Sequence, residues 1–170
     1  HEGVSEAEEN RSANANKLCE VRGGKVWAFY GARYSISNEN TPISIVLPGT
    51  NETLTTKVTV HNIISGGEIG GGVVAGSGEH DVQIGTKAYY GACKNSSRKV
   101  TSVCNEIKGG TIYNFKASGS TSSKTYAPTN VYNYIHGTKE VYPTFLCDFY
   151  GTNNSGGYNV TNIIKGYPKF

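Results

Sequence analysis

The sequence has few of the residues on which many enzyme active sites depend. Its 170 residues include no methionine, one tryptophan, and aspartate only at positions 81 and 148. Paired carboxylates for sugar hydrolysis are hard to place, because the second half holds only Glu106, Glu140 and Asp148. No G-x-S-x-G motif marks a serine nucleophile. We therefore expect a protein that is not an enzyme. The chain also lacks the apolar run of about 20 residues that spans a bilayer.

A glycine-rich stretch from Ser65 to Asp81 raises the question of nucleotide binding. Gly70, Gly72 and Ala75 match a loose form of the dinucleotide fingerprint. That fingerprint needs a helix whose N–H groups hold the phosphate, but the residues that follow alternate like a strand. The Gly-Lys pair of a P-loop is missing too. We expect these glycines to serve turns, and we predict no nucleotide, nucleic acid or other cofactor.

From Lys25 onward, short runs rich in Val, Ile, Tyr, Phe and Thr are separated by Gly, Asn, Pro or Ser. Several runs alternate in polarity, and no segment after residue 20 has helical periodicity. This pattern predicts an all-β fold, an antiparallel β-sandwich or open barrel, formed by a single domain of residues 25–170. Residues 1–24 form a polar N-terminal segment able to adopt a short helix. Strands are predicted at 25–36, 43–47, 54–64, 71–76, 81–90, 99–107, 111–118, 130–137, 141–151 and 158–166.

One short similarity occurs at an offset of 100 residues: "VHNIISG" at 60–66 resembles "VTNIIKG" at 160–166. It is compatible with equivalent strands in two sheets. A match of this length usually arises by chance, so we base no prediction on it.

The cysteines and N-glycosylation sequons indicate a secreted, extracellular protein. The four cysteines show no C-x-x-C spacing, which favours disulfides over a zinc site. Of three pairings, we favour Cys93–Cys104 across a short hairpin, which leaves Cys19–Cys147; the alternative is four buried free thiols. Sequons for N-linked glycans stand at Asn10, Asn51, Asn95, Asn153 and Asn159.

Two regions are candidate contact sites. Tyrosines concentrate near the C-terminus, where Tyr132 and Tyr134 share one face of a predicted strand and can stack on a sugar or dock on a protein. Packing in the hydrophobic core is an equal alternative for these rings. The loop that carries Lys94, Arg98 and Lys99 can meet an anionic partner, and residues 86–170 are basic overall. A solvated surface without a partner is the alternative there.

A metal site is a third, weaker hypothesis. If His1 is a native N-terminus, its amine and imidazole can chelate copper together with His61 or His80, as in secreted copper monooxygenases with a β-sandwich fold. His136 is another candidate ligand. The polar, flexible-looking residues that follow His1 argue against this arrangement.

These observations lead to one main functional prediction and one alternative. The main prediction is a secreted, disulfide-stabilised, non-enzymatic β-sandwich protein that binds an extracellular protein, glycan or anionic surface, in the manner of an adhesin, lectin, toxin or effector. The alternative is a structural subunit of an extracellular fibre or coat, a homo-oligomer that assembles through its N-terminal segment.

Overall fold

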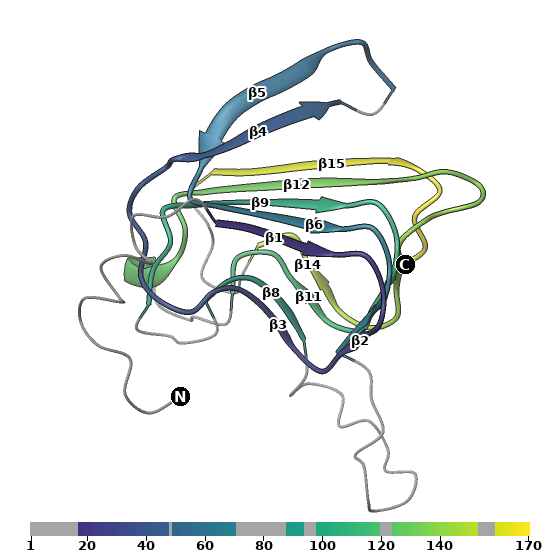
Figure 1. Ribbon diagram of the computed structural model, residues 1–170, viewed down its shortest axis with the longest axis horizontal. Coiled ribbons are helices and arrows are strands. Elements are labelled where there is room, and N and C mark those ends of the chain that lie inside the picture. Colours follow the sequence, from purple (N-terminus) through teal and green to yellow (C-terminus); the bar gives the residue numbers. More distant parts are fainter. Residues whose placement is uncertain (1–16, 48, 71–87, 94–97, 120–123, 153–158) are drawn as a thin grey trace, which may run out of the picture.

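Most strands of the protein lie in three parallel sheets (Figure 1). The computed structural model describes residues 17–47, 49–70, 88–93, 98–119, 124–152 and 159–170. Sheet A contains, in order, β1 (Lys17–Val21), β6 (Val60–Ile64), β9 (Ser102–Ile107), β12 (Asn130–Gly137) and β15 (Asn159–Gly166). Sheet B contains β2 (Lys25–Val26), β7 (Glu68–Ile69), β10 (Thr111–Ile112) and β13 (Thr144–Phe145). Sheet C contains β3 (Phe29–Ala32), β8 (Tyr89–Cys93), β11 (Phe115–Lys116) and β14 (Phe149–Tyr150).

The chain visits the three sheets in turn and then returns to the first, so successive coils stack along one axis. This is a parallel β-helix, and the predicted antiparallel sandwich or open barrel is wrong. The all-β content is as expected, because the one helix in the described residues is a 3₁₀ turn at Lys124–Tyr126. Alternating polarity marks a strand with one buried face but does not say which strand lies beside it. In a β-helix, each strand pairs with the strand one coil away.

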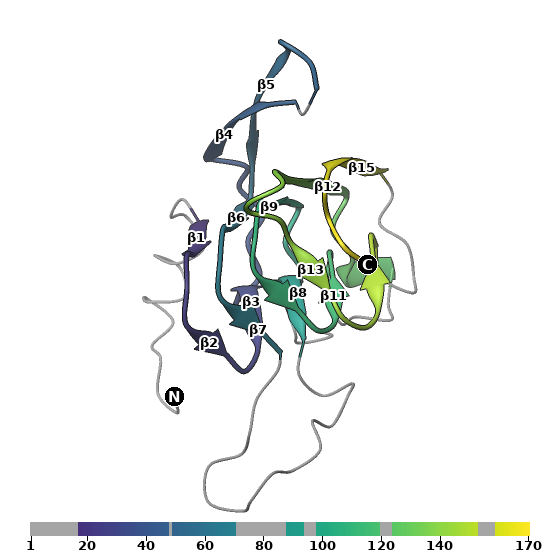
Figure 2. The ribbon, with the colours of Figure 1, turned by 90° about the vertical axis from the view of Figure 1, so that its right-hand side faces the viewer.

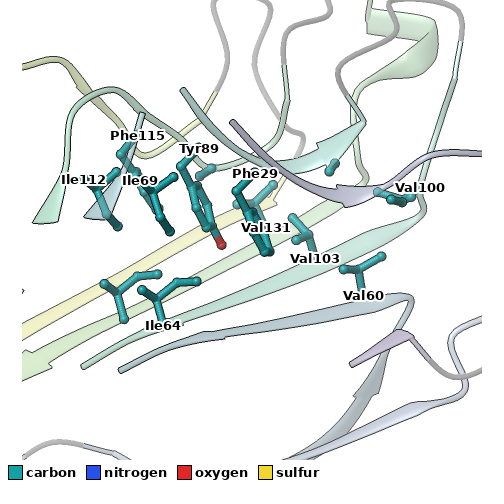
Figure 3. Packing of buried hydrophobic residues seen from close by; sticks show 14 of the residues in the cluster. Phe29, Val60, Ile64, Ile69, Tyr89, Val100, Val103, Ile112, Phe115 and Val131 are labelled. Carbon is teal, nitrogen blue, oxygen red and sulfur yellow. The ribbon is translucent and has the colours of Figure 1, made fainter. Parts of the chain in front are cut away.

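The interior of the β-helix is built from columns of like residues. Val60, Val103 and Val131 occupy the same position on neighbouring strands of sheet A, and all three are fully buried. Facing them, aromatic rings from sheet C stack with centroid spacings of 4.8–4.9 Å (Figure 3). That spacing matches the distance between neighbouring strands, so the sheets themselves set the ring stacking. The aromatic column consists of Phe29, Tyr89, Phe115 and Phe149.

An asparagine ladder runs through the same interior. The Nδ2 atom of Asn62 donates to Oδ1 of Asn105 (3.0 Å), Asn105 donates to Asn133 (2.8 Å), and Asn133 donates to Asn162 (2.7 Å). The first three also donate to a carbonyl oxygen of sheet C or just after it, at Gly91, Ala117 and Gly151 respectively. Each rung therefore joins two sides of one coil and two neighbouring coils, which rigidifies sheet A.

Glycine makes the tight turn from sheet A to sheet B. Gly67 and Gly110 have φ angles of +86° and +85°, in the left-handed region that other residues rarely adopt. A Cβ atom on Gly110 would also lie 2.9 Å from backbone oxygens of the coil below. The glycines predicted to serve turns do so here, whereas residues 71–87 lie outside the described part of the chain.

An antiparallel hairpin interrupts the first coil. Its strands, β4 (Thr41–Val46) and β5 (Thr53–Val58), pair with each other and project beyond the stack of coils (Figure 2). The apolar residues of the hairpin pack on the outer face of sheet A, where they bury Cys104 and Tyr134. The hairpin members of this cluster are Ile43, Ile45 and Val58, with Leu47 and Leu54 at its margin.

The N-terminal boundary of the β-helix differs from the sequence-based expectation. Residues 17–21, placed in the polar segment 1–24, form β1 at the edge of sheet A. Residues 1–16, including the predicted short helix, lie outside the described part of the chain. In that described part, no helix is long and apolar enough to cross a membrane.

Candidate binding face on sheet A

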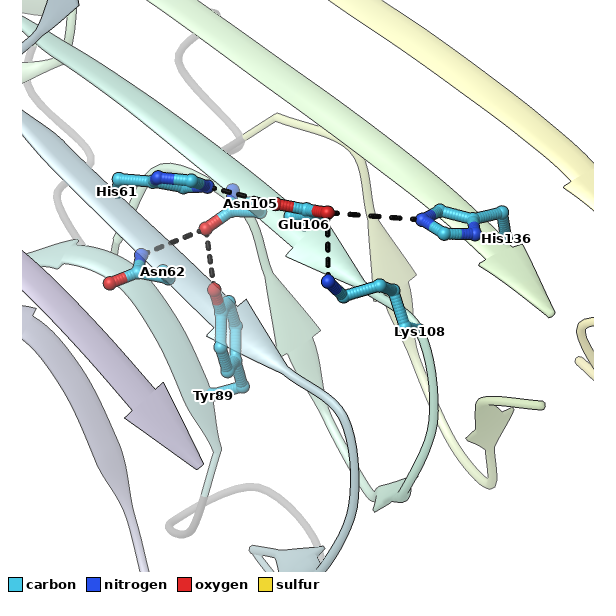
Figure 4. Close-up of polar contacts among 7 residues, drawn as sticks. All are labelled: His61, Asn62, Tyr89, Asn105, Glu106, Lys108 and His136. Atoms are coloured by element: carbon cyan, nitrogen blue, oxygen red, sulfur yellow. Dashed lines mark hydrogen bonds and ion pairs between the residues drawn. The ribbon is translucent and has the colours of Figure 1, made fainter. Parts of the chain in front are cut away.

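The outer face of sheet A carries a cluster of charged and ionisable side chains. Strand alternation sends Asn105 inward and its neighbour Glu106 outward (Figure 4). Oε2 of Glu106 lies 3.1 Å from Nε2 of His61, and Oε1 lies 3.1 Å from Nζ of Lys108. The Nε2 atom of His136 lies 4.0 Å from Oε1 on the opposite side. Three neighbouring strands thus hold their polar groups around one carboxylate.

The cluster keeps the Glu106 carboxylate ionised. Burial by itself raises the pKa of Glu106, but contacts with His136, His61 and Lys108 outweigh burial and hold its pKa well below the usual range. The Glu106 side chain is 11% exposed, whereas Lys108 is 38% and His136 is 31% exposed. Glu106 therefore serves as an anchor for the more accessible Lys108 and His136, rather than as a proton donor.

A column of basic residues stands at the end of the sheet A strands. His136 on β12 is in register with Lys165 on β15. Ile107, the last residue of β9, is in register with Ile135, so Lys108 and His136, which directly follow them, occupy the same position in neighbouring coils. These three side chains therefore come from three successive coils at the same position, spaced by about 4.8 Å per strand. Lys165 is exposed. The column presents nitrogen donors at regular intervals along the axis of the β-helix.

The two tyrosines predicted to make contacts lie beside this column on β12. Their rings are nearly parallel, with centroids 6.5 Å apart. Tyr134 is buried under the hairpin, and burial raises its pKa to about 12, whereas Tyr132 is only partly buried. Of this pair, only Tyr132 is reachable for a ligand. The alternative of a packing role therefore describes Tyr134.

The predicted basic loop lies elsewhere on the molecule. Arg98 places its guanidinium 5.6 Å from the ring centroid of Tyr34, and Arg33 lies 5.3 Å from the same ring. Lys99 is held at its backbone by a hydrogen bond to Oγ of Ser35 (3.1 Å). Lys94 lies outside the described residues. Arg98 and Lys99 thus contact Tyr34 and Ser35, which follow β3, rather than the cluster around Glu106.

The predicted disulfides are absent: all four cysteines are free thiols. Cys93 and Cys104 do not share a hairpin, because β8 belongs to sheet C and β9 to sheet A. The Cys93 thiol points into the core and donates to the carbonyl of Tyr34 (3.5 Å), while Cys104 lies under the outer hairpin. Cys19 is part of the interior of β1, and Cys147 is exposed. Burial raises the pKa of Cys93 to about 11, opposed by Arg98.

The remaining predicted positions fall partly outside the described residues. His1 and His80 lie there, as do the sequons at Asn10, Asn95 and Asn153. Asn51 is exposed in the hairpin loop, and Asn159 is exposed at the start of β15, where its Nδ2 donates to Asn130 (3.0 Å). Within the described ranges, no group of three His, Cys, Asp or Glu residues is arranged to hold a metal ion.

Sequence reasoning missed Lys108, Lys165, the whole asparagine ladder and the contacts of Glu106 with the histidines. The available signal was the pattern N-x-I-x-G, which starts at Asn62, Asn105, Asn133 and Asn162. The intervals between these asparagines are 43, 28 and 29 residues, so a fixed period does not reveal them. The similarity between 60–66 and 160–166 was set aside as chance, but these segments are equivalent positions in β6 and β15, three coils apart.

Comparisons with known proteins find no match for the chain among protein-family models, curated proteins or solved structures.

Proposed function

We propose that this protein is a non-enzymatic binding protein that holds an acidic glycan on the outer face of sheet A, at an extracellular surface. The observation that carries the proposal is the column of Lys108, His136 and Lys165 on successive coils. Two lysine ammonium groups and an imidazole between them, at a regular spacing on a rigid sheet, suit a polymer with a repeating carboxylate or sulfate group. Tyr132, partly exposed on the same strand as His136, offers an apolar ring face to a sugar.

The arrangement favours binding over catalysis. Glu106 is the one carboxylate among the clustered groups, and its contacts with His61, Lys108 and His136 keep it ionised. A carboxylate held by these contacts orients the surrounding lysine and histidine side chains but does not deliver a proton. The four free thiols remove the disulfide argument for secretion, so the proposed extracellular location rests on the sequons, of which Asn51 and Asn159 are exposed.

The test compares the binding of three probes: a sulfated glycosaminoglycan, a polyuronate and neutral dextran. We expect binding to the two acidic polymers only, and we expect it to weaken as the salt concentration rises. Lys165→Gln should raise the dissociation constant about fivefold, as expected for the loss of about 1 kcal/mol from one charged contact.

The matched control is Lys57→Gln, which removes one exposed lysine from the hairpin strand β5. It should bind like the unchanged protein. Equal binding of dextran, or equal effects of the two substitutions, would remove the proposal. The molar mass of Lys165→Gln is measured alongside, so that a change in association state is not mistaken for a change in affinity.

A further inference from the structure

The C-terminal end of the β-helix exposes core residues. Among the described strands, β15 pairs on one side only, with β12, and Figure 2 shows it at the end of the stack opposite β1. Val160 and Ile164 continue the columns of Val131 and Ile135, but they are 36% and 41% exposed, whereas Val131 and Ile135 are fully buried. An open sheet edge above an uncovered apolar core is a surface that favours association.

Further apolar surface lies at the same end. Phe170 stacks on Phe145 (5.1 Å between centroids) and contacts the edge of Phe149, the last ring of the interior aromatic column, yet it remains largely exposed. Asn162 is the last rung of the ladder: it accepts from Asn133, and no later rung among the described residues accepts from its amide. The end of the β-helix therefore offers apolar rings, two aliphatic side chains and an amide donor.

Antiparallel pairing of β15 with a second copy of β15 would match these groups with each other. With the twofold axis at Asn162, Val160 lies opposite the partner's Ile164, and Asn162 lies opposite the partner's Asn162. Directly opposed residues of antiparallel strands point to the same face, so all of these side chains meet on the core side of the sheet. The two amides can then donate to each other.

The charges distinguish this arrangement from head-to-tail stacking. If β1 of another copy continued sheet A in the existing register, Lys17 would lie over Val160, as it lies over Val60 within one chain, and Arg22 would lie beside Lys165. Two like charges, Arg22 and Lys165, would then be adjacent. In the antiparallel register, Lys165 lies opposite the partner's Asn159, which is uncharged, and the two copies of Lys165 are held apart. The charge distribution therefore selects self-pairing of β15.

We propose that two copies of this chain form a twofold-symmetric, end-to-end dimer through antiparallel pairing of their β15 edges, with Asn162 on the axis. Such an interface is isologous and closes at two subunits. The register places Asn159, a sequon, next to the interface, so a glycan at Asn159 and the dimer compete for the same edge. Protein produced without glycans is therefore the material for the test.

The experiment measures molar mass by light scattering and sedimentation over a range of protein concentrations. The unchanged protein should have twice the chain mass of 18.2 kDa. Val160→Glu and Ile164→Lys, each alone, should weaken dimerisation at least tenfold, because each places a charge against an apolar partner. The double variant should restore the dimer, because each new acid then faces a new base across the axis.

Restoration by the double variant is specific to this register. A single-chain mass at every concentration would overturn the proposal, as would a polymer that grows with concentration, the signature of head-to-tail stacking. A double variant that is folded by circular dichroism but no longer dimerises would overturn it too. If the single variants do not fold, hydrogen exchange of the unchanged protein decides the matter: amides of β15 should gain protection as protein concentration rises, and unchanged protection would contradict the dimer.

Discussion

The two faces of sheet A, made by alternate residues of the same strands, differ in kind. On the inner face, each position repeats from coil to coil, with columns of valine, isoleucine and asparagine. On the outer face, neighbouring coils carry different residues, and polar contacts run diagonally, as from His61 to Glu106 (Figure 4). Identical side chains stack because each coil is a translated copy of the previous one. The inner face therefore carries the repeat that defines the β-helix, whereas the residues of the outer face are not constrained by it.

If the inner face of sheet A stabilises the fold more than the outer face, the largest loss of stability should follow a substitution in the centre of the asparagine ladder. Asn105→Ala removes the Oδ1 atom that accepts hydrogen bonds from the buried Tyr89 hydroxyl and from Asn62. It also removes the Nδ2 group that donates to the Ala117 carbonyl and to Asn133. We expect a loss of about 4 kcal/mol in the free energy of unfolding, measured in urea, because several buried polar groups lose partners together.

Asn130→Ala is the control for that change. Asn130 accepts a hydrogen bond from Asn159 of the next coil, but at an exposed position. Its substitution should cost less than about 0.5 kcal/mol, because water replaces the lost partner. Similar losses for the two variants would show that the ladder contributes nothing beyond an ordinary surface contact.

The outer cluster should have a smaller effect that depends on pH. Glu106→Gln should reduce the free energy of unfolding at pH 7 by about 2 kcal/mol, because it removes a buried carboxylate that contacts the Lys108 ammonium and the His61 ring. The pKa of Glu106 is lowered in the folded state, so its contribution is present above the ordinary value of 4.5 and declines as pH falls below it.

The difference in stability between the unchanged protein and the variant should accordingly shrink steadily as the pH is lowered from 5 to 3, and should disappear only at lower pH, where the folded-state carboxylate is itself protonated. A difference that stays constant over this interval would contradict the assigned role of Glu106. Glu20→Gln, which breaks the exposed pair with Arg22, is the control and should leave stability nearly unchanged at either pH.

The smallest expected effect is an increase in the free energy of unfolding. Cys19 occupies the ladder position of β1, where its thiol donates to the carbonyl of Gly31 (3.6 Å), and the buried Oδ1 of Asn62 has no partner. Cys19→Asn should supply donors to both acceptors and raise the free energy of unfolding by about 1 kcal/mol. Cys19→Ala is the comparison: if the two variants are equally stable, the first coil does not continue the ladder.

The location of most strands could be predicted from the sequence, but not their partners. The predicted runs 43–47, 54–64, 99–107 and 130–137 each overlap strands of the structure. The expected hairpin between Cys93 and Cys104 is wrong because strands adjacent in sequence lie in different sheets. The side-chain cluster on the outer face of sheet A was not predicted: His61 and His136 were considered as copper ligands, but Glu106, which lies between them, was considered only as a catalytic carboxylate.

By itself, the sequence determined that the chain folds as strands, that glycines make its turns, and that valine, isoleucine and aromatic residues alternate with polar ones. Local steric preference and the two-residue period of a strand are enough for that. The tertiary structure decided that strands 28 to 43 residues apart become neighbours, which brings scattered asparagines into a ladder and scattered lysine and histidine residues into a column. The physical reason is that parallel pairing between coils joins residues by position within the coil, whatever the length of the loops between them.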